Sequence, residues 1–316
     1  MPALISGRSA HRGYRHEAVY YRGEGEFLDL VVPFIRDGVD ALQPVMVAVI
    51  GPRIAALQKE LGTAAGGVQF VDMSELGRNP ARIIPAWREF LDRHCTAGPI
   101  RGVGEPIWAG RRPAELQECQ LHEALLNMAV APSTPFWLLC PYDRAGLDAA
   151  VIEEAARSHP VIVEPKVYRG STTYGGSHHA AELFARELPA PAEPVRRLMV
   201  DPSAGHNVSD WVRRWAEASG VQRRRAAGLA AAVRTVAQAT EAHTGRSQML
   251  QLWQQGSDLM CELHDPTPVG DPMIGRRLPG QDNSRGRALS AAHQTCDLVQ
   301  VRSNADGTTV RVHTWL

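Results

Sequence analysis

Acidic, imidazole and aromatic side chains concentrate in a few short stretches of the first half of the chain. Carboxylates and imidazoles are the side chains that most often act as general acids and bases, and in a cleft they also hold polar ligands. The candidates for acid–base catalysis are Glu105, His122, Asp143 and His159. The candidates for ligand binding are Glu105, Trp108, Arg111, His122, Glu123, Tyr142 and Asp143.

The elements that must position these side chains alternate between strand and helix from residue 18 to residue 163. Apolar, β-prone runs cover 18–21, 44–50, 68–72, 100–105, 136–143 and 160–163. Apolar residues at helical spacing cover 24–42, 54–61, 80–97, 113–130 and 147–158. Strand followed by helix, repeated, predicts an α/β fold in which a parallel sheet carries helices on both faces.

Polar residues that follow the strands of such a sheet lie where open sheets bind ligands. Asp72, Glu105 and Asp143 each follow a different predicted strand. His122 and Glu123 belong to a helical stretch that can face the same crevice. The sequence therefore predicts a ligand-binding crevice at this edge of the sheet.

The same side chains also fit purely structural roles. Glu105 and Arg111 can form an ion pair, Asp143 can cap the next helix, and Trp108 can serve packing alone. Both interpretations stay open at this point.

Metal and haem sites are disfavoured. Cys140-Pro141 is similar to a haem-ligand dipeptide, but it lies in a run typical of a buried strand. His178 and His179, with His159, are the histidines considered for a metal site. Adjacent residues on a helix point about 100° apart, so the neighbouring pair does not easily bind one ion.

The second half of the chain has its own pattern. After a helix at 178–187, the proline-rich stretch 188–194 predicts a stiff linker. Beyond it we expect strands at 195–200, 248–255, 259–263, 296–303 and 307–312, and helices at 208–219, 222–244 and 285–296. The predicted domains are thus 1–187 and 195–316, joined by 188–194. Trp211 and Trp215 favour a core position for the helix 208–219, although it can also pack between domains or in a homodimer.

Composition excludes several classes of protein. Of the 316 residues, 44% are apolar, and 34 basic residues balance 34 acidic ones. This balance argues against a broad surface for nucleic acid. There is no apolar run of the roughly 18 residues that suggests a membrane span, and 1–14 lacks the apolar core of a signal peptide, so a cytoplasmic protein is expected. The five cysteines are widely spaced, without a zinc pattern, which predicts reduced and mostly buried thiols.

Four motifs in the first half resemble a known family. They are 102–112, 119–127, 138–143 and Ser158-His159-Pro160. Together they look like the MEDS sensory domain that precedes a kinase-like domain in RsbA-type anti-sigma regulators of actinobacteria. The resemblance implies a RecA-like fold that senses a small molecule or a protein. The segment 50–54 lacks the glycine-rich loop and the Lys-Ser/Thr pair that cradle phosphates, so nucleotide hydrolysis is not expected here.

The segments 257–265, 296–303 and 307–312 resemble the GHKL ATPase domain of anti-sigma-factor serine kinases, which implies an α/β sandwich. That family uses a helix with a Glu base and, four residues on, an Asn that holds Mg²⁺. When His243-Thr244-Gly245 is aligned with the family's His-Gly-Gly, these two positions carry Thr235 and Ala239, and no register pairs Glu with Asn. Phosphoryl transfer then lacks its main electrostatic support.

Two further nucleotide motifs are also altered. The family's Asp-x-Gly reads Asp265-Pro266-Thr267, and its glycine-rich turn retains only Gly286 between two arginines. Asp265 and Gly286 therefore mark a vestigial nucleotide pocket. No cofactor is predicted, and ATP with Mg²⁺ is not expected to bind.

The expected function is sensing and regulation. The resemblance implies binding of a small-molecule or protein signal and control of a sigma factor or anti-sigma antagonist by protein–protein interaction. Two alternatives stay open: an enzyme that uses the acid–base groups in the N-terminal or interdomain crevice, and a serine kinase with residual activity.

Overall fold

The computed structural model describes residues 13–191, 194–200, 205–245, 247–278 and 280–316. The chain divides into two compact units, Met1–Ala180 and Ala181–Leu316. Residues 192 and 193 of the predicted linker, and residues 1–12 of the N-terminal stretch 1–14, lie outside the described residues. Across the described part of the chain, no helix combines the length and the apolar composition needed to cross a membrane.

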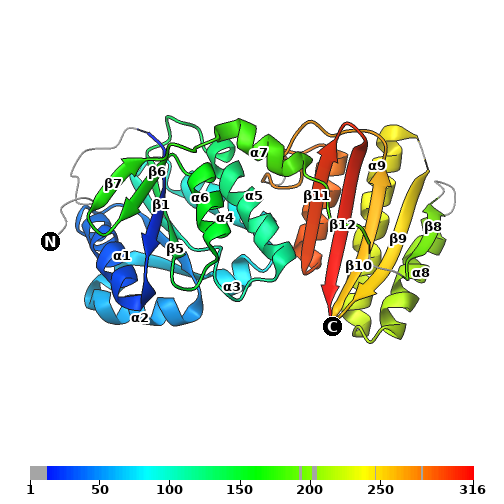
Figure 1. Cartoon of the computed structure of the whole chain (residues 1–316), viewed down its shortest axis with the longest axis horizontal. Helices are drawn as coiled ribbons and strands as arrows, with labels where there is room; N and C mark the ends of the chain where they lie inside the picture. The colour runs from blue at the N-terminus through cyan, green and yellow to red at the C-terminus, as the bar shows by residue number, and fades with distance from the viewer. Residues whose placement is uncertain (1–12, 192–193, 201–204, 246, 279) are drawn as a thin grey trace. The chain divides into compact units, whose positions relative to one another are not determined.

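The first unit is built on a seven-stranded sheet in the order β3-β2-β4-β5-β1-β6-β7 (Figure 1). The strands are β1 (Arg15–Tyr21), β2 (Val45–Val49), β3 (Val68–Asp72), β4 (Ile100–Gly104), β5 (Phe136–Asp143), β6 (Val161–Glu164) and β7 (Val167–Gly170). All neighbours pair in parallel except β6 with β7. The predicted, mostly parallel α/β sheet is therefore confirmed.

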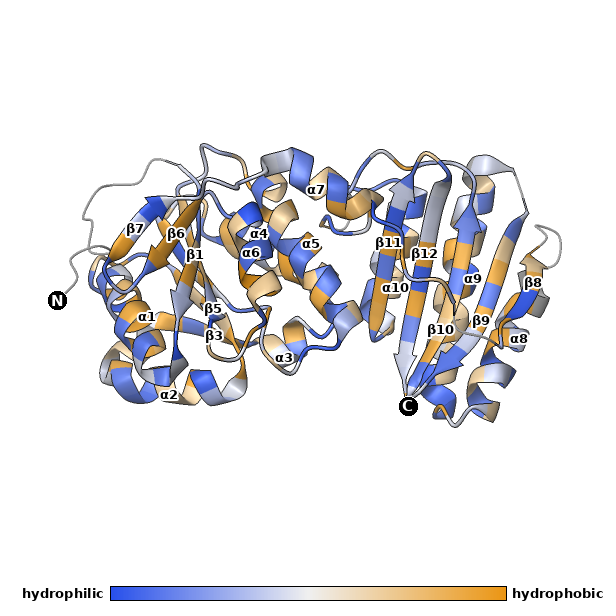
Figure 2. Cartoon of the chain, in the orientation of Figure 1, coloured by the Kyte–Doolittle hydropathy of each residue, from blue (hydrophilic) through white to orange (hydrophobic). Residues whose placement is uncertain are grey.

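Helices cover both faces of this sheet. They are α1 (Gly23–Asp40), α2 (Gly51–Leu61), α3 (Met73–Leu76), α4 (Ile83–Arg93), α5 (Pro113–Ala129) and α6 (Ala149–Ser158), and α7 (Gly176–Ala185) crosses into the second unit. On one face, side chains of α1 and α2 pack on alternate residues of the strands, such as Val19 and Val47. Strand residues of the opposite parity face the other way, toward α5 and α6. Figure 2 shows a largely apolar β6, and all residues of β2 and β4 are buried, as burial on two faces requires.

One strand was not predicted. No strand was predicted between residues 163 and 178, yet β7 lies there and pairs antiparallel with β6. All four residues of β7 are exposed, including Val167 and Tyr168. A short, exposed edge strand has no buried face, so it leaves no apolar periodicity in the sequence.

The second unit is a five-stranded antiparallel sheet in the order β11-β12-β10-β9-β8. Its strands are β8 (Arg196–Val200), β9 (Gln248–Gln255), β10 (Asp258–Asp265), β11 (Leu298–Asn304) and β12 (Gly307–Trp315). The helices α8 (Gly205–Ala218), α9 (Arg223–Thr244) and α10 (Ser284–Thr295) lie on one side of it (Figure 1). Trp215 of α8 is buried, in agreement with the predicted core position, and Trp211 is half-buried.

Candidate functional site

Glu105 lies at the carboxyl ends of the parallel strands, where the sequence predicted a crevice. The Tyr21 hydroxyl, at the end of β1, donates a hydrogen bond of 2.7 Å to Glu105 Oε1. Arg53 Nε, in the first turn of α2, is 2.8 Å from Glu105 Oε2. Glu105 is only 1% exposed. Burial raises the pKa of Glu105 to about 7, although Arg53 and Tyr21 act in the opposite direction. This carboxyl is therefore close to half-protonated at neutral pH.

Arg53 links Glu105 to Asp143 at the same edge. Its guanidinium is 3.9 Å from Asp143 Oδ2 and lies over the rings of Tyr21 and Phe27. Asp143 Oδ1 also accepts hydrogen bonds from the backbone N–H groups of Gly23 and Ala145. The structure thus brings Glu105 and Asp143 together around a cation that the sequence reasoning did not select.

The structural alternatives predicted for these residues were wrong in two details. Arg111 pairs with Glu115 at 3.3 Å, not with Glu105, and its guanidinium lies 3.8 Å from the ring centroid of Trp108. The N-cap of α6 is Asp148, whereas Asp143 contacts the first residue of α1. The physical reason is local: Arg111 reaches the residue four positions on, which lies on the same face of the turn.

A second cluster joins four side chains from β1, α5, β5 and the end of α6. His16 Nε2 is 3.1 Å from Glu123 Oε2, and His159 Nε2 is 3.2 Å from the same oxygen. Cys140 Sγ is 3.3 Å from His16 Nε2. His16, Glu123 and Cys140 are each 1% exposed and His159 is 0% exposed. One ligating atom from each residue lies within 4.8 Å of all the others, as in a metal site.

Neighbouring groups hold both imidazole rings of this cluster. His16 Nδ1 is 3.1 Å from Asn127 Oδ1, and His159 Nδ1 is 2.8 Å from the backbone oxygen of Ala155. Burial, followed by the nearby His159, lowers the pKa of His16 to about 4. Aromatic rings complete the surroundings: Tyr14 stacks on His16, and Tyr142 packs edge-on against His159. The cluster is therefore rigid and dry.

The two clusters lie at opposite ends of the sheet. His16 and Tyr21 are five residues apart on β1, which corresponds to roughly 16 Å at the rise of a strand. The expectation that Glu123 faces the same crevice as Glu105 was therefore wrong. Tyr142 and Asp143 also separate, because successive strand residues point to opposite faces.

The remaining candidates do not join either cluster. His122 is buried on α5, and on a helix it points about 100° away from Glu123. His179 contacts Glu154, whereas His159 contacts Glu123, so these two histidines have different acidic partners. Of the four acid–base candidates, Glu105 and Asp143 thus lie together around Arg53, whereas His122 and His159 lie elsewhere in the first unit.

A groove of about 530 Å³ opens beside β1, β6 and α6. Its lining includes Arg144, Arg157, Arg169 and the hydroxyl-bearing run 171–173. None of the predicted site residues lines it. No motif in the sequence pointed to this groove, because its lining combines residues of β1, α6, β6 and β7 with the run 171–173, which lie apart along the chain.

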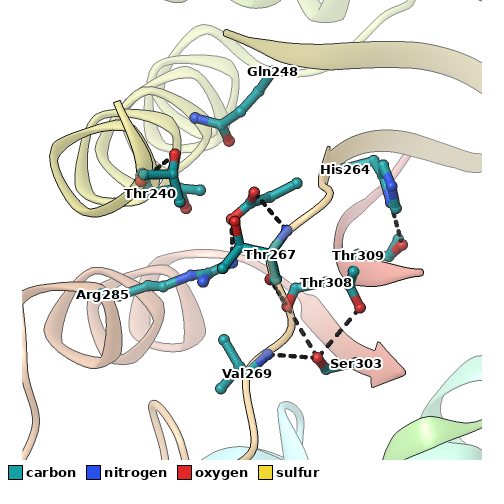
Figure 3. Close-up of polar contacts among 12 residues, drawn as sticks. Thr240, Gln248, His264, Thr267, Val269, Arg285, Ser303, Thr308 and Thr309 are labelled. Carbon is teal, nitrogen blue, oxygen red and sulfur yellow. Dashed lines mark hydrogen bonds and ion pairs between the residues drawn. The ribbon is translucent and has the colours of Figure 1, made fainter. Parts of the chain in front are cut away.

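In the second unit, the residue aligned with the nucleotide-reading Asp has protein partners (Figure 3). Arg285 Nη2 is 3.0 Å from Asp265 Oδ2, and the Thr267 N–H donates to Asp265 Oδ1 at 2.9 Å. Asp265 and Arg285 are 2% and 4% exposed. The Thr308 hydroxyl donates to the Thr267 carbonyl, which ties this turn to β12. The carboxylate is therefore sealed inside the protein.

The other vestigial position, Gly286, is also used internally. Its N–H donates to the N-cap side chain of Asn283 at 2.9 Å. A Cβ at Gly286 would lie 2.5 Å from Asp282 Cγ, so the Asp282 side chain would have to shift to admit an alanine there. A groove of about 400 Å³ between α9 and α10 is lined by Thr235, Gln238, Ala239, Ser284, Arg287 and Ala288. This lining offers no carboxylate or asparagine to hold Mg²⁺ among the described residues.

Residues 15–160 match the family model described as MEDS, the MEthanogen/methylotroph, DcmR Sensory domain. This part of the chain is a MEDS domain. The resemblance predicted from the four sequence motifs is thereby confirmed for the first unit. No curated protein matches the chain.

Both clusters of the first unit belong to the MEDS domain, since they extend from His16 to His159. Sequence reasoning missed His16 and Arg53 as site residues, and it considered Cys140 only as a haem ligand. His16 precedes a β-prone run without any motif of its own. Its contact with Cys140 depends on β1 lying next to β5, a pairing that no local pattern reveals.

Proposed function

We propose that this chain is a two-unit regulator that senses through its MEDS domain and acts by binding another protein. The matched family is a sensory domain, which supports a sensing role for the first unit. The partner we propose is a sigma factor or an anti-sigma antagonist. This choice follows from the resemblance of the second unit to the kinase-like domain of anti-sigma regulators.

One observation carries the proposal that the second unit does not transfer phosphate. The Asp265–Arg285 ion pair is buried. Arg285 therefore already binds the carboxylate that would accept a hydrogen bond from an adenine amino group. A nucleotide would have to displace a guanidinium that is bound through a charge-assisted hydrogen bond. The groove that would hold the phosphates lacks a ligand for Mg²⁺ as well. Both features support a second unit that binds a partner protein and does not act as a kinase.

The charged edge of the MEDS domain is the proposed place for a polar signal. Glu105, Arg53 and Asp143 present two carboxyl groups and one cation at the carboxyl ends of parallel strands. Glu105 can donate or accept a proton near neutral pH. Acid–base catalysis is less well supported, because His122 and His159 lie away from this edge.

The test uses the purified full-length chain in two binding measurements. Titration calorimetry with ADP and ATP, each with Mg²⁺, is expected to give no saturable binding. Biolayer interferometry against each sigma factor and each anti-sigma antagonist of the source genome is expected to give saturable binding to at least one of them. A micromolar ATP affinity together with phosphorylation of an antagonist would support the residual kinase and overturn the proposal. Binding to none of those proteins would overturn the proposed partner.

A further inference from the structure

The buried cluster of His16, Glu123, Cys140 and His159 in the MEDS domain offers more hydrogen-bond acceptors than donors. Asn127 Nδ2 donates to the Ser158 carbonyl at 2.8 Å, so Asn127 turns its oxygen toward His16. His16 Nδ1 must then be the protonated nitrogen. His159 Nδ1 faces the backbone oxygen of Ala155, which can only accept. A neutral imidazole carries one N–H, so both Nε2 atoms point a lone pair at Glu123.

Three acceptors therefore meet at one point without enough donors. His16 Nε2 and His159 Nε2 are 3.1 and 3.2 Å from Glu123 Oε2, and only the Cys140 thiol brings a proton. Glu123 Oε1 is buried and has no hydrogen-bond partner among the described residues. Each buried polar group that lacks a hydrogen-bond partner in this arrangement destabilises the fold. Charging both rings is no remedy, because their centroids are 4.1 Å apart in a site closed to water.

We propose that His16, Glu123, Cys140 and His159 bind one divalent transition-metal ion, and that zinc is the ion that fits best. The inference does not rest on the proposed regulatory function. A cation at the point where the lone pairs converge satisfies all four ligands at once. It also explains why each histidine donates its other N–H to an oxygen, the usual outer-shell arrangement of metal-bound histidine.

The distances agree with tetrahedral coordination. Zinc binds nitrogen and oxygen at about 2.0–2.2 Å and sulfur at about 2.3 Å, which places neighbouring ligand atoms roughly 3.3–3.6 Å apart. The three contacts of 3.1, 3.2 and 3.3 Å are close to such edges. A small outward movement of the ligands would admit the ion.

The donor types select the ion. Two imidazoles and a thiolate are poor ligands for Mg²⁺ and Ca²⁺, which prefer oxygen, and are good ligands for zinc. Four protein ligands with 0–1% exposure leave no open position for a water or a substrate. The site therefore resembles a closed structural centre that joins β1, α5, β5 and the end of α6.

The first test measures metal content in the full-length chain. After loading with Zn²⁺ and removal of excess ion, elemental analysis is expected to find about one zinc per chain. Cys140→Ser and His159→Gln are expected to weaken zinc binding by at least about tenfold in competition with a chromophoric chelator. Cys119→Ser is the matched control: Cys119 is also a buried thiol on α5, and its sulfur contacts the carbonyl of Pro106.

The second test needs no variant, so a failure of Cys140→Ser to fold does not affect it. Co²⁺ loaded into the unmodified chain is expected to give the intense visible bands of a tetrahedral ion. A sulfur-to-cobalt charge-transfer band in the near ultraviolet is expected beside them. A folded protein that binds neither Zn²⁺ nor Co²⁺ would overturn the proposal. The four side chains would then share protons with one another and bind no metal ion. Retention of the charge-transfer band in a folded Cys140→Ser chain, or its loss in Cys119→Ser, would also overturn it.

Discussion

Removal of the Arg285 guanidinium is expected to be strongly destabilising for the second unit. Arg285→Met keeps the length of the side chain but leaves Asp265 as a buried carboxylate with only the Thr267 N–H for a partner. The two side chains are 5% and 3% exposed, and their charged atoms are 3.0 Å apart. Loss of one member of such a pair costs about 3–5 kcal/mol, because the remaining charge stays buried without compensation.

A double-mutant cycle separates the pair from the packing around it. Asp265→Asn retains an oxygen for the Thr267 N–H and removes the charge. In the double variant neither charge is present. Its loss of unfolding free energy should therefore be smaller than the sum of the losses in the two single variants, by about 2 kcal/mol or more. This non-additivity is the expected sign of a buried ion pair.

The assay must report on the second unit alone, because the chain has two compact units and need not unfold in one step. Hydrogen exchange is measured along a urea series by mass spectrometry of peptides from β10 and α10. It gives the free energy of unfolding of the second unit. Arg213→Met is the control: its partner Glu217 is 30% exposed, and such a surface pair contributes little. If Arg285→Met lowers the unfolding free energy no more than Arg213→Met does, the reasoning is refuted.

Three other perturbations have defined outcomes. Because the folded pKa of Glu105 is about 7 and lies above its usual 4.5, its stabilising effect is complete below pH 4.5 and disappears as pH rises through 7. The contribution of Glu105 to the unfolding free energy should fall by about 3 kcal/mol over this window. The lowered pKa of buried His16 acts in the opposite direction, so the fall is measured as the difference between the unmodified chain and Glu105→Gln in urea titrations at each pH. Gly286→Ala should lower the melting temperature through its contact with Asp282, whereas Gly228→Ala within α9, where a Cβ would meet only the Thr295 carbonyl at an ordinary 3.9 Å, should raise it. Asn127→Ala should weaken zinc binding by about 10–100-fold in chelator competition; an unchanged affinity would mean that Asn127 does not set the ring of His16.

The order of strands and helices followed from the sequence because most elements bury a face. The buried strand β2 is a continuous apolar run, and α4 carries its apolar residues at helical spacing. Periodicity of this kind is a local property, so it can be read without knowing the neighbours. The exposed edge strand β7 has no such pattern, and it was missed for that reason.

The candidate sites were harder to predict, for two different physical reasons. Some errors were avoidable: Tyr142 and Asp143 are adjacent on a strand, so they had to face opposite sides of the sheet. The cluster around Glu123 was not predictable in this way. His16 and Cys140 are 124 residues apart in sequence, and they meet only because β1 enters the sheet between β5 and β6. Contacts that depend on the order of strands in a sheet cannot be predicted from the spacing of residues along the chain.

The buried carboxylate of Asp265 depends on a compensating charge from the protein. A buried carboxylate is costly unless another group compensates its charge. Arg285 supplies that charge from the first turn of α10, and the Asp265 turn closes further on Thr267 and Thr308. Under the proposed resemblance to a GHKL domain, the residues at Thr235 and Ala239 and the ion pair at Asp265 would be connected changes. Introduction of a Mg²⁺ ligand alone would then leave the carboxylate of Asp265 paired with Arg285, so we expect no nucleotide binding from that change alone.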